Sequence, residues 1–132
     1  MNQDSIKKET ENQSKRQEIS QELLAIDRAI GLSYCMDVEE VYQEMLLEFG
    51  NQMEEYSAEL EKCYETADWE RYASITHAIK GNALTIGASN FSELSKQHEF
   101  AAKEQNIEFI RTEYPVYGEA LKKLTAQVKT LS

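Results

Sequence analysis

The chain has 132 residues, the length of a single domain that can bury a hydrophobic core. Hydrophobic residues make up 41% of it and charged residues 29%, with one proline and five glycines, so the composition favours helices over a loop-rich or all-strand fold. The net charge of -10 argues against binding to nucleic acid or to an anionic membrane surface, and we therefore expect protein partners.

No apolar run approaches the length of a membrane span, and the N-terminus lacks the apolar core of a signal peptide. We therefore expect a soluble, cytoplasmic protein. The acidic excess is concentrated between Asp37 and Thr66, where ten acidic residues accompany a single lysine, Lys62. This segment is expected to form a solvated helix face that aids solubility. Cys35 and Cys63 form no CxxC pair and are expected to be reduced thiols without a function.

Residues 1–18 contain Ile6 as their one apolar side chain besides Met1, and their acidic and basic residues balance. Such a polar segment cannot bury enough apolar surface to fold. It is predicted to be a flexible tail or linker in front of a domain over residues 19–132.

Two helices are expected in the first half of this domain. Apolar residues recur at helical spacing over residues 19–30, and Gly31 follows as a stop signal. Asp37 and Glu40 form a capping box at the start of a long helix over residues 37–66. The apolar face of the long helix is predicted to consist of Val38, Val41, Tyr42, Met45, Phe49, Met53, Tyr56, Leu60 and Cys63.

A third helix is expected to begin at the N-cap Asp68 and to end near Gly87. At about 100° per residue, His77 lies about 140° and Gly81 about 180° from Tyr72, which belongs to the apolar stripe. His77 and Gly81 should therefore point away from the core. The apolar stripe itself comprises Trp69, Tyr72, Ile75, Ile79, Ala83 and Ile86.

Two more helices complete the predicted fold. Asn90 and Glu93 form a second capping box, which opens a fourth helix through about Gln105. A fifth helix follows over residues 107–131, and Pro115 should kink it or end its first part. Long amphipathic helices with short connections predict an all-α protein, an antiparallel four-helix bundle preceded by a short helix. The inward positions of the fourth helix are Phe91, Leu94, His98 and Ala101 or Ala102.

The face of the third helix around His77 carries no carboxylate, which is unusual in so acidic a chain. Gly81 follows His77 by one turn and would leave the imidazole open to another protein's backbone. Lys80 lies about 60° round the helix from His77 and could place its ammonium beside an anion attached to the ring. The outward residues accompanying His77 are Ser74, Gly81, Leu84, Thr85 and Ala88.

An exposed imidazole with a nearby cation suits phosphoryl transfer. Neutral imidazole is a nucleophile near neutral pH, and its phosphoryl adduct can pass the group onward. Because such transfer depends on positioning and charge neutralisation, the metal and most of the apparatus can belong to a partner. Each residue alone would be interpreted as an ordinary surface residue, whereas their combination on one face favours a phosphocarrier.

The segment THAIKGNALTIGASNFSEL resembles the signature of histidine-containing phosphotransfer (HPt) domains. The upstream segment IGLSYCMDVEEVYQEMLLEF is similar to the entry of that family into its long second helix, so the resemblance covers residues from about 19 to 131. In it His77 matches the phospho-accepting histidine. The other matches are Ile79 at the apolar position, Lys80 and Gly81 as the Lys-Gly pair, Gly87 and Ala88 as the Gly-Ala pair, and Glu99 as the acidic residue of the next helix.

The resemblance implies a phosphocarrier that relays a phosphoryl group between receiver-domain aspartates in a two-component multistep phosphorelay. Lys80 would offset the phosphate charge, Gly81 would give access, and Leu84 with Ala88 would form part of the docking surface. The implied partners are response-regulator receiver domains and a hybrid sensor histidine kinase. Mg²⁺ is expected on the receiver, while this chain is expected to bind no cofactor or metal and to be a monomer. It has no nucleotide-binding motif, so it should have no ATP-dependent kinase activity.

Two positions depart from the family pattern. Asn82 stands where serine or alanine is more usual, without an expected loss of activity, and His98 replaces a leucine. We expect His98 to be a core or edge histidine with a hydrogen bond, and neither a second phosphorylation site nor a metal ligand.

Two alternatives remain open from the sequence alone. One is a non-catalytic helical adaptor that binds a signalling partner through the His77 face. The other is a plain bundle that oligomerises through the seam between Tyr114 and Leu131. The choice of the reactive ring nitrogen is also open, although Nε2 should be the more outward one.

Overall fold

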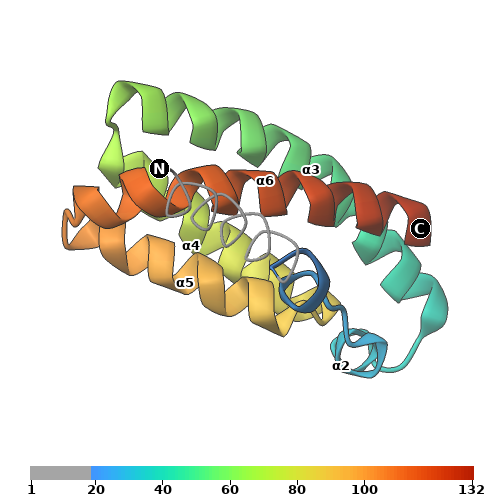
Figure 1. Cartoon of the computed structure of the whole chain (residues 1–132). Helices are drawn as coiled ribbons and strands as arrows, with labels where there is room; N and C mark the ends of the chain where they lie inside the picture. Colours follow the sequence, from blue (N-terminus) through green and yellow to red (C-terminus); the bar gives the residue numbers. More distant parts are fainter. Residues whose placement is uncertain (1–18) are drawn as a thin grey trace, which may run out of the picture.

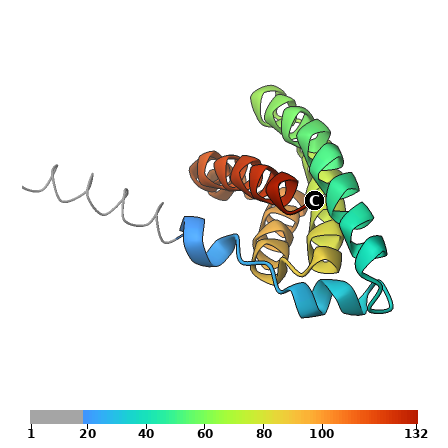
Figure 2. The same cartoon turned by 90° about the vertical axis from the view of Figure 1, so that its right-hand side faces the viewer.

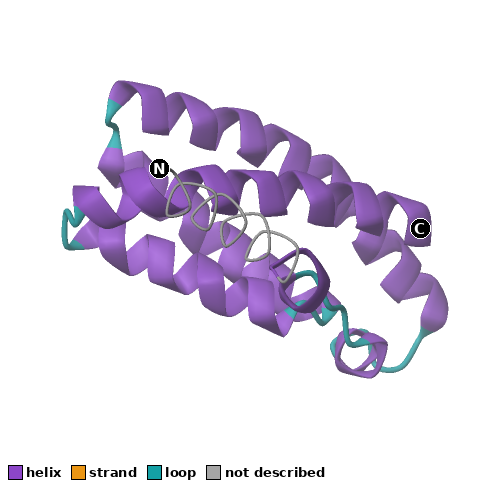
Figure 3. Cartoon of the chain, viewed as in Figure 1, coloured by secondary structure: helices purple, strands orange, loops and turns teal. Residues whose placement is uncertain are grey.

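The computed structural model describes residues 19–132, which form helices joined by short connections (Figure 3). The predicted tail over residues 1–18 lies outside this part of the chain. No strand occurs between residues 19 and 132. Over the same residues, no helix combines the length and the apolar character that crossing a membrane requires.

Four long helices form an antiparallel bundle (Figure 1). They are α3 (Glu39–Thr66), α4 (Trp69–Ile86), α5 (Ser89–Lys103) and α6 (Ile107–Leu131). Helix α3 packs against α4 and α6, and α5 packs against the same two helices, so the core lies between all four. The predicted all-α bundle is confirmed, and α4 and α5 form its most extensive helix pair.

The expected single first helix is instead two short elements, a π-helix η1 (Ile19–Leu23) and an α-helix α2 (Arg28–Ser33). The break has a local cause, because the Asp27 carboxylate accepts hydrogen bonds from the backbone N–H groups of Ala29 and Ile30 and so starts a new helix. Helix α2 lies crosswise to the long helices, at one end of the bundle (Figure 2).

Gly31 is not the predicted stop signal, since it lies buried inside α2. A Cβ atom at this position would collide with the Tyr42 ring and with the backbone oxygen of Ile86. The Tyr42 hydroxyl also donates to that oxygen at 3.0 Å. Gly31 therefore allows α2 to approach α3 and the end of α4 closely.

The predicted capping box at the start of α3 is wrong. The helix begins at Glu39 and its N-cap is Val38, which makes no side-chain cap hydrogen bond. Met36 and Asp37 both adopt positive φ angles of 53° and 59°, so Asp37 lies before the cap in a left-handed conformation. The predicted end at Thr66 is confirmed.

The buried face of α3 is also rotated slightly from the predicted one. Leu46, which the predicted face omitted, is buried, whereas Val38 and Val41 are exposed. In the first turn of α3, Tyr42 is buried, and Val41 beside it faces solvent.

Helix α4 has the predicted boundaries, whereas α5 begins differently. The Asp68 carboxylate accepts from the Arg71 N–H at 3.2 Å, and Gly87 ends α4 with a φ of 93°. The capping box expected at Asn90 is wrong, since the N-cap of α5 is Ala88. The Asn90 side chain instead donates to the backbone oxygen of Glu22 at 3.0 Å, tying α5 to η1.

Helix α6 continues through Pro115, so the proline does not end its first part. Proline has no N–H to donate to the backbone oxygen of Arg111, four residues earlier. That oxygen instead accepts from the Tyr64 hydroxyl of α3 at 3.4 Å. A neighbouring helix thus supplies the donor that the proline lacks.

Candidate functional site

His77 projects from the outer face of α4, as the apolar stripe of that helix predicts. Its side chain is 65% exposed, while Ile75 and Ile79 on either side of it are buried. Gly81, one turn further on, is exposed, and a Cβ atom there would meet no heavy atom within 4 Å. Leu84 is exposed on the same side. The approach to the imidazole along this face is therefore open.

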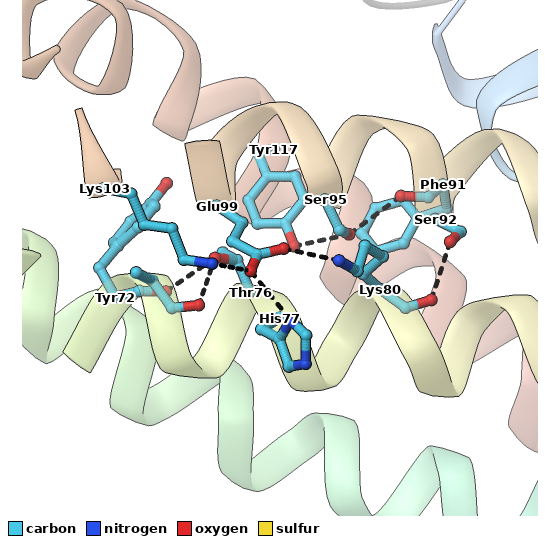
Figure 4. A network of polar contacts seen from close by, with 11 residues as sticks. Tyr72, Thr76, His77, Lys80, Phe91, Ser92, Ser95, Glu99, Lys103 and Tyr117 are labelled. Carbon is cyan, nitrogen blue, oxygen red and sulfur yellow. Dashed lines mark hydrogen bonds and ion pairs between the residues drawn. The ribbon is translucent and has the colours of Figure 1, made fainter. Parts of the chain in front are cut away.

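The carboxylate of Glu99 lies beside the imidazole and accepts three charge-assisted hydrogen bonds (Figure 4). Its Oε2 atom accepts from Nδ1 of His77 at 2.9 Å and from Nζ of Lys103 at 2.7 Å, and its Oε1 atom accepts from Nζ of Lys80 at 2.8 Å. The side chain of Glu99 is only 1% exposed. Four residues of α4 and α5 thus form one polar cluster, the Glu99 cluster.

The Glu99 cluster fixes the ionisation of its carboxylate. Burial alone would raise the pKa of Glu99, but the hydrogen bonds from Lys103, Lys80 and His77 outweigh it and lower the pKa to about 2. The carboxylate is therefore ionised at neutral pH and can only accept hydrogen bonds.

The ionised carboxylate in turn selects the tautomer of His77. Because Glu99 cannot donate, Nδ1 must carry the proton of the neutral ring, and the lone pair lies on Nε2. Nε2 points away from the Glu99 cluster (Figure 4). The nitrogen that the sequence left undecided is thus distinguished by its surroundings, since Nε2 is the exposed nucleophilic one.

The structure places Lys80 against Glu99 and not on the open side of the ring. Its side chain is 28% exposed, and its backbone oxygen accepts from the Ser92 hydroxyl of α5 at 2.8 Å. In this conformation the ammonium neutralises the Glu99 carboxylate.

Ala88 is a correction to the predicted docking surface. It is completely buried and serves as the N-cap of α5, and its N–H donates to the backbone oxygen of Ala83 at 2.9 Å. The helical spacing that placed it beside His77 ends at Gly87, whose positive φ turns the chain away. Its side chain therefore cannot contact a docked protein.

A groove of about 630 Å³ lies beside His77, between the first half of α4 and the end of α5. Neither this groove nor the position of Lys103 at its edge was predicted from the sequence. Lys103 follows Glu99 by four residues, a spacing that brings opposite charges together on a helix and could have indicated the pair. The groove is lined by His77 together with Trp69, Glu70, Ala73, Ser74, Glu99, Ala102, Lys103 and Gln105. The exposed Glu70, two turns before His77 on the same side of α4, contradicts the prediction that this face carries no carboxylate.

The second histidine, His98, is buried in the core, as predicted. Its Nδ1 atom lies 2.8 Å from the Tyr72 hydroxyl, and its ring stacks on Tyr117 with 4.1 Å between centroids. Burial lowers the pKa of His98 to about 3, so its ring is neutral. Its Nε2 atom has no hydrogen-bond partner within residues 19–132.

Neither histidine belongs to a metal-binding cluster. Within the described residues, no group of three or more His, Cys, Asp or Glu side chains is placed to hold a metal ion.

The chain is similar to a known protein family. The family model described as the Hpt domain matches residues 44–131, which include His77, Lys80, Gly81, Glu99 and Lys103. No curated protein and no solved structure gives a significant match. The matched region covers most of α3 and all of α4, α5 and α6, and therefore the whole of the Glu99 cluster.

Proposed function

Because the chain belongs to the Hpt domain family, whose members are phosphocarriers in phosphorelays and not kinases, we propose that His77 carries the phosphoryl group through Nε2. The observation that supports this most strongly is the contact between His77 Nδ1 and the ionised carboxylate of Glu99. It leaves the Nε2 lone pair exposed, next to the open position at Gly81.

The transfer step uses this arrangement directly. The lone pair of Nε2 attacks the phosphorus of an aspartyl phosphate on the partner, so that an N–P bond forms and the P–O bond breaks. The electron pair leaves with the aspartate carboxylate. The proton stays on Nδ1, and the ring becomes cationic, so the Glu99 carboxylate stabilises the charge that develops. Delivery to a second aspartate is the same step in reverse.

The partners in this proposal are response-regulator receiver domains, together with a hybrid sensor histidine kinase, in a cytoplasmic multistep phosphorelay. The receiver would supply the aspartate and bind the Mg²⁺, and this chain would act as a monomer. Gly81 would leave room for the receiver backbone, and Leu84 would contact it. Lys80 would lower the cost of bringing a phosphoryl group near Glu99 by neutralising that carboxylate.

Transfer from a phosphorylated receiver domain in the presence of Mg²⁺ tests the proposal. The chain should gain a phosphoryl group that is labile in acid and stable in alkali, His77→Ala should gain none, and His98→Leu should gain as much as the parent. Circular dichroism would establish that both variants are folded. Equal labelling of His77→Ala would refute the assignment. Receiver binding by the parent and by His77→Gln without any phosphohistidine would instead show an adaptor.

A further inference from the structure

The two lysines of the Glu99 cluster are not equivalent. Lys80 contacts Oε1, whereas Lys103 contacts Oε2, the same oxygen that accepts from Nδ1 of His77. Nζ of Lys103 and Nδ1 of His77 are therefore linked through one shared acceptor atom, Oε2 of Glu99. The Lys103 side chain is 58% exposed and lines the groove beside His77, while that of Lys80 is 28% exposed.

Charge balance within the cluster changes when Nε2 is phosphorylated. Before the reaction the Glu99 carboxylate contacts two ammonium groups, that of Lys80 at Oε1 and that of Lys103 at Oε2. After attack the ring carries a positive charge on the side of Nδ1, which contacts the same oxygen. The cationic ring can then replace Lys103 as the neutralising partner of Oε2. The phosphoryl group, with its additional negative charge, can then attract the Lys103 ammonium, whose place at Oε2 the cationic ring has taken.

We propose that Lys103 exchanges partners during the reaction, moving from Glu99 to the phosphoryl group on His77, while Lys80 stays on Glu99. This inference rests on the proposed function and reassigns the phosphate-contacting role that the sequence gave to Lys80. Lys103 is the last residue of α5, and its long, exposed side chain leaves its ammonium able to change partner.

The exchange can be tested by recording the ³¹P NMR chemical shift of the phosphoryl group on His77 as a function of pH, which gives the midpoint of its titration. A cation in contact with a phosphoryl group favours its dianionic form, so losing that cation raises the titration midpoint. Lys103→Gln should raise the midpoint by about one pH unit. Lys103→Arg should restore the parent midpoint, because the guanidinium keeps the charge.

Two further variants serve as controls. Lys80→Gln removes the lysine that stays on Glu99. Lys96→Gln removes a lysine of α5, the helix of Lys103, whose ammonium contacts the Phe100 ring and not Glu99. Lys96→Gln should keep the parent midpoint, and Lys80→Gln should raise it by clearly less than Lys103→Gln does, because Lys80 acts on the phosphoryl group only through Glu99. A parent midpoint in Lys103→Gln, or a rise in Lys80→Gln at least as large as in Lys103→Gln, would overturn the exchange. Absence of any phosphohistidine signal from the parent chain would refute the proposed function itself.

Discussion

Replacing Glu99 with glutamine removes the charge at the centre of the site while preserving its shape. The pKa of Glu99 is lowered from its ordinary value of 4.5 to about 2 by its three donors. Since one pH unit corresponds to about 1.4 kcal/mol, the ionised carboxylate contributes about 3 kcal/mol to the free energy of unfolding at neutral pH. Glu99→Gln should lose most of this contribution.

The pH dependence gives the sign of the effect. Because the pKa is lower in the folded chain, the contribution is complete above pH 4.5 and is lost as the pH falls from there toward 2. Urea unfolding followed by circular dichroism measures the free energy of unfolding of the parent and of Glu99→Gln. The difference between the two should narrow by about 1.4 kcal/mol for each pH unit below pH 4.5. The control Glu93→Gln removes an exposed carboxylate on the same helix and should change stability by less than about 0.5 kcal/mol. If the difference in the free energy of unfolding does not depend on pH, or is no larger than that of Glu93→Gln, the ionised Glu99 carboxylate does not stabilise the fold.

Three further substitutions test separate parts of the account. Gly81→Leu should leave unfolding unchanged or raise its free energy by about 1 kcal/mol, from helix propensity, while slowing phosphotransfer; an unchanged transfer rate would contradict the access role. The pKa of His98 is lowered from 6.5 to about 3, so protonation favours the unfolded parent as the pH falls below 6.5. Between pH 6.5 and 4.5, above the range in which Glu99 is protonated, His98→Leu should remove that loss of about 1.4 kcal/mol per pH unit, and a slope persisting there in urea unfolding would exclude His98 as its source. Ala67 has a φ of 58°, a left-handed conformation that glycine adopts at lower cost. Ala67→Gly should therefore raise the free energy of unfolding by about 1 kcal/mol and with it the melting temperature, and a lower melting temperature would contradict this.

Helix boundaries were predictable from the sequence where the capping side chain has no competing partner. Asp68 caps α4 as expected because its carboxylate bonds to the backbone of its own helix. Asn90 and Asp37 resembled caps equally well, but tertiary structure uses them differently. Asn90 donates to the backbone of η1, and Asp37 lies in a left-handed turn that connects α2 with α3. The Asn90 contact joins residues far apart in the sequence, so it leaves no local pattern, whereas Asp37 is held by a turn in which its own N–H donates to the backbone oxygen of Leu32.

The same distinction applies to the site. The direction of His77 depends only on the apolar stripe of α4, so periodicity alone predicts it. The contact with Glu99 depends on how α5 is rotated against α4, which no single-helix pattern specifies, and only the resemblance to the HPt family singled out Glu99. The error at Ala88 arose because helical spacing was extended across Gly87, where the helix ends.

The central claim is that Nε2 of His77 carries the phosphoryl group while Nδ1 remains bound to Glu99. NMR of the phosphorylated chain with ¹⁵N-labelled histidine measures this directly, through the coupling between phosphorus and the ring nitrogen bonded to it. We expect coupling to Nε2 of a single histidine and a proton on Nδ1 of the same ring, and we expect both signals to be lost in His77→Gln. Coupling to Nδ1, or a phosphohistidine signal that survives in His77→Gln, would contradict the central claim.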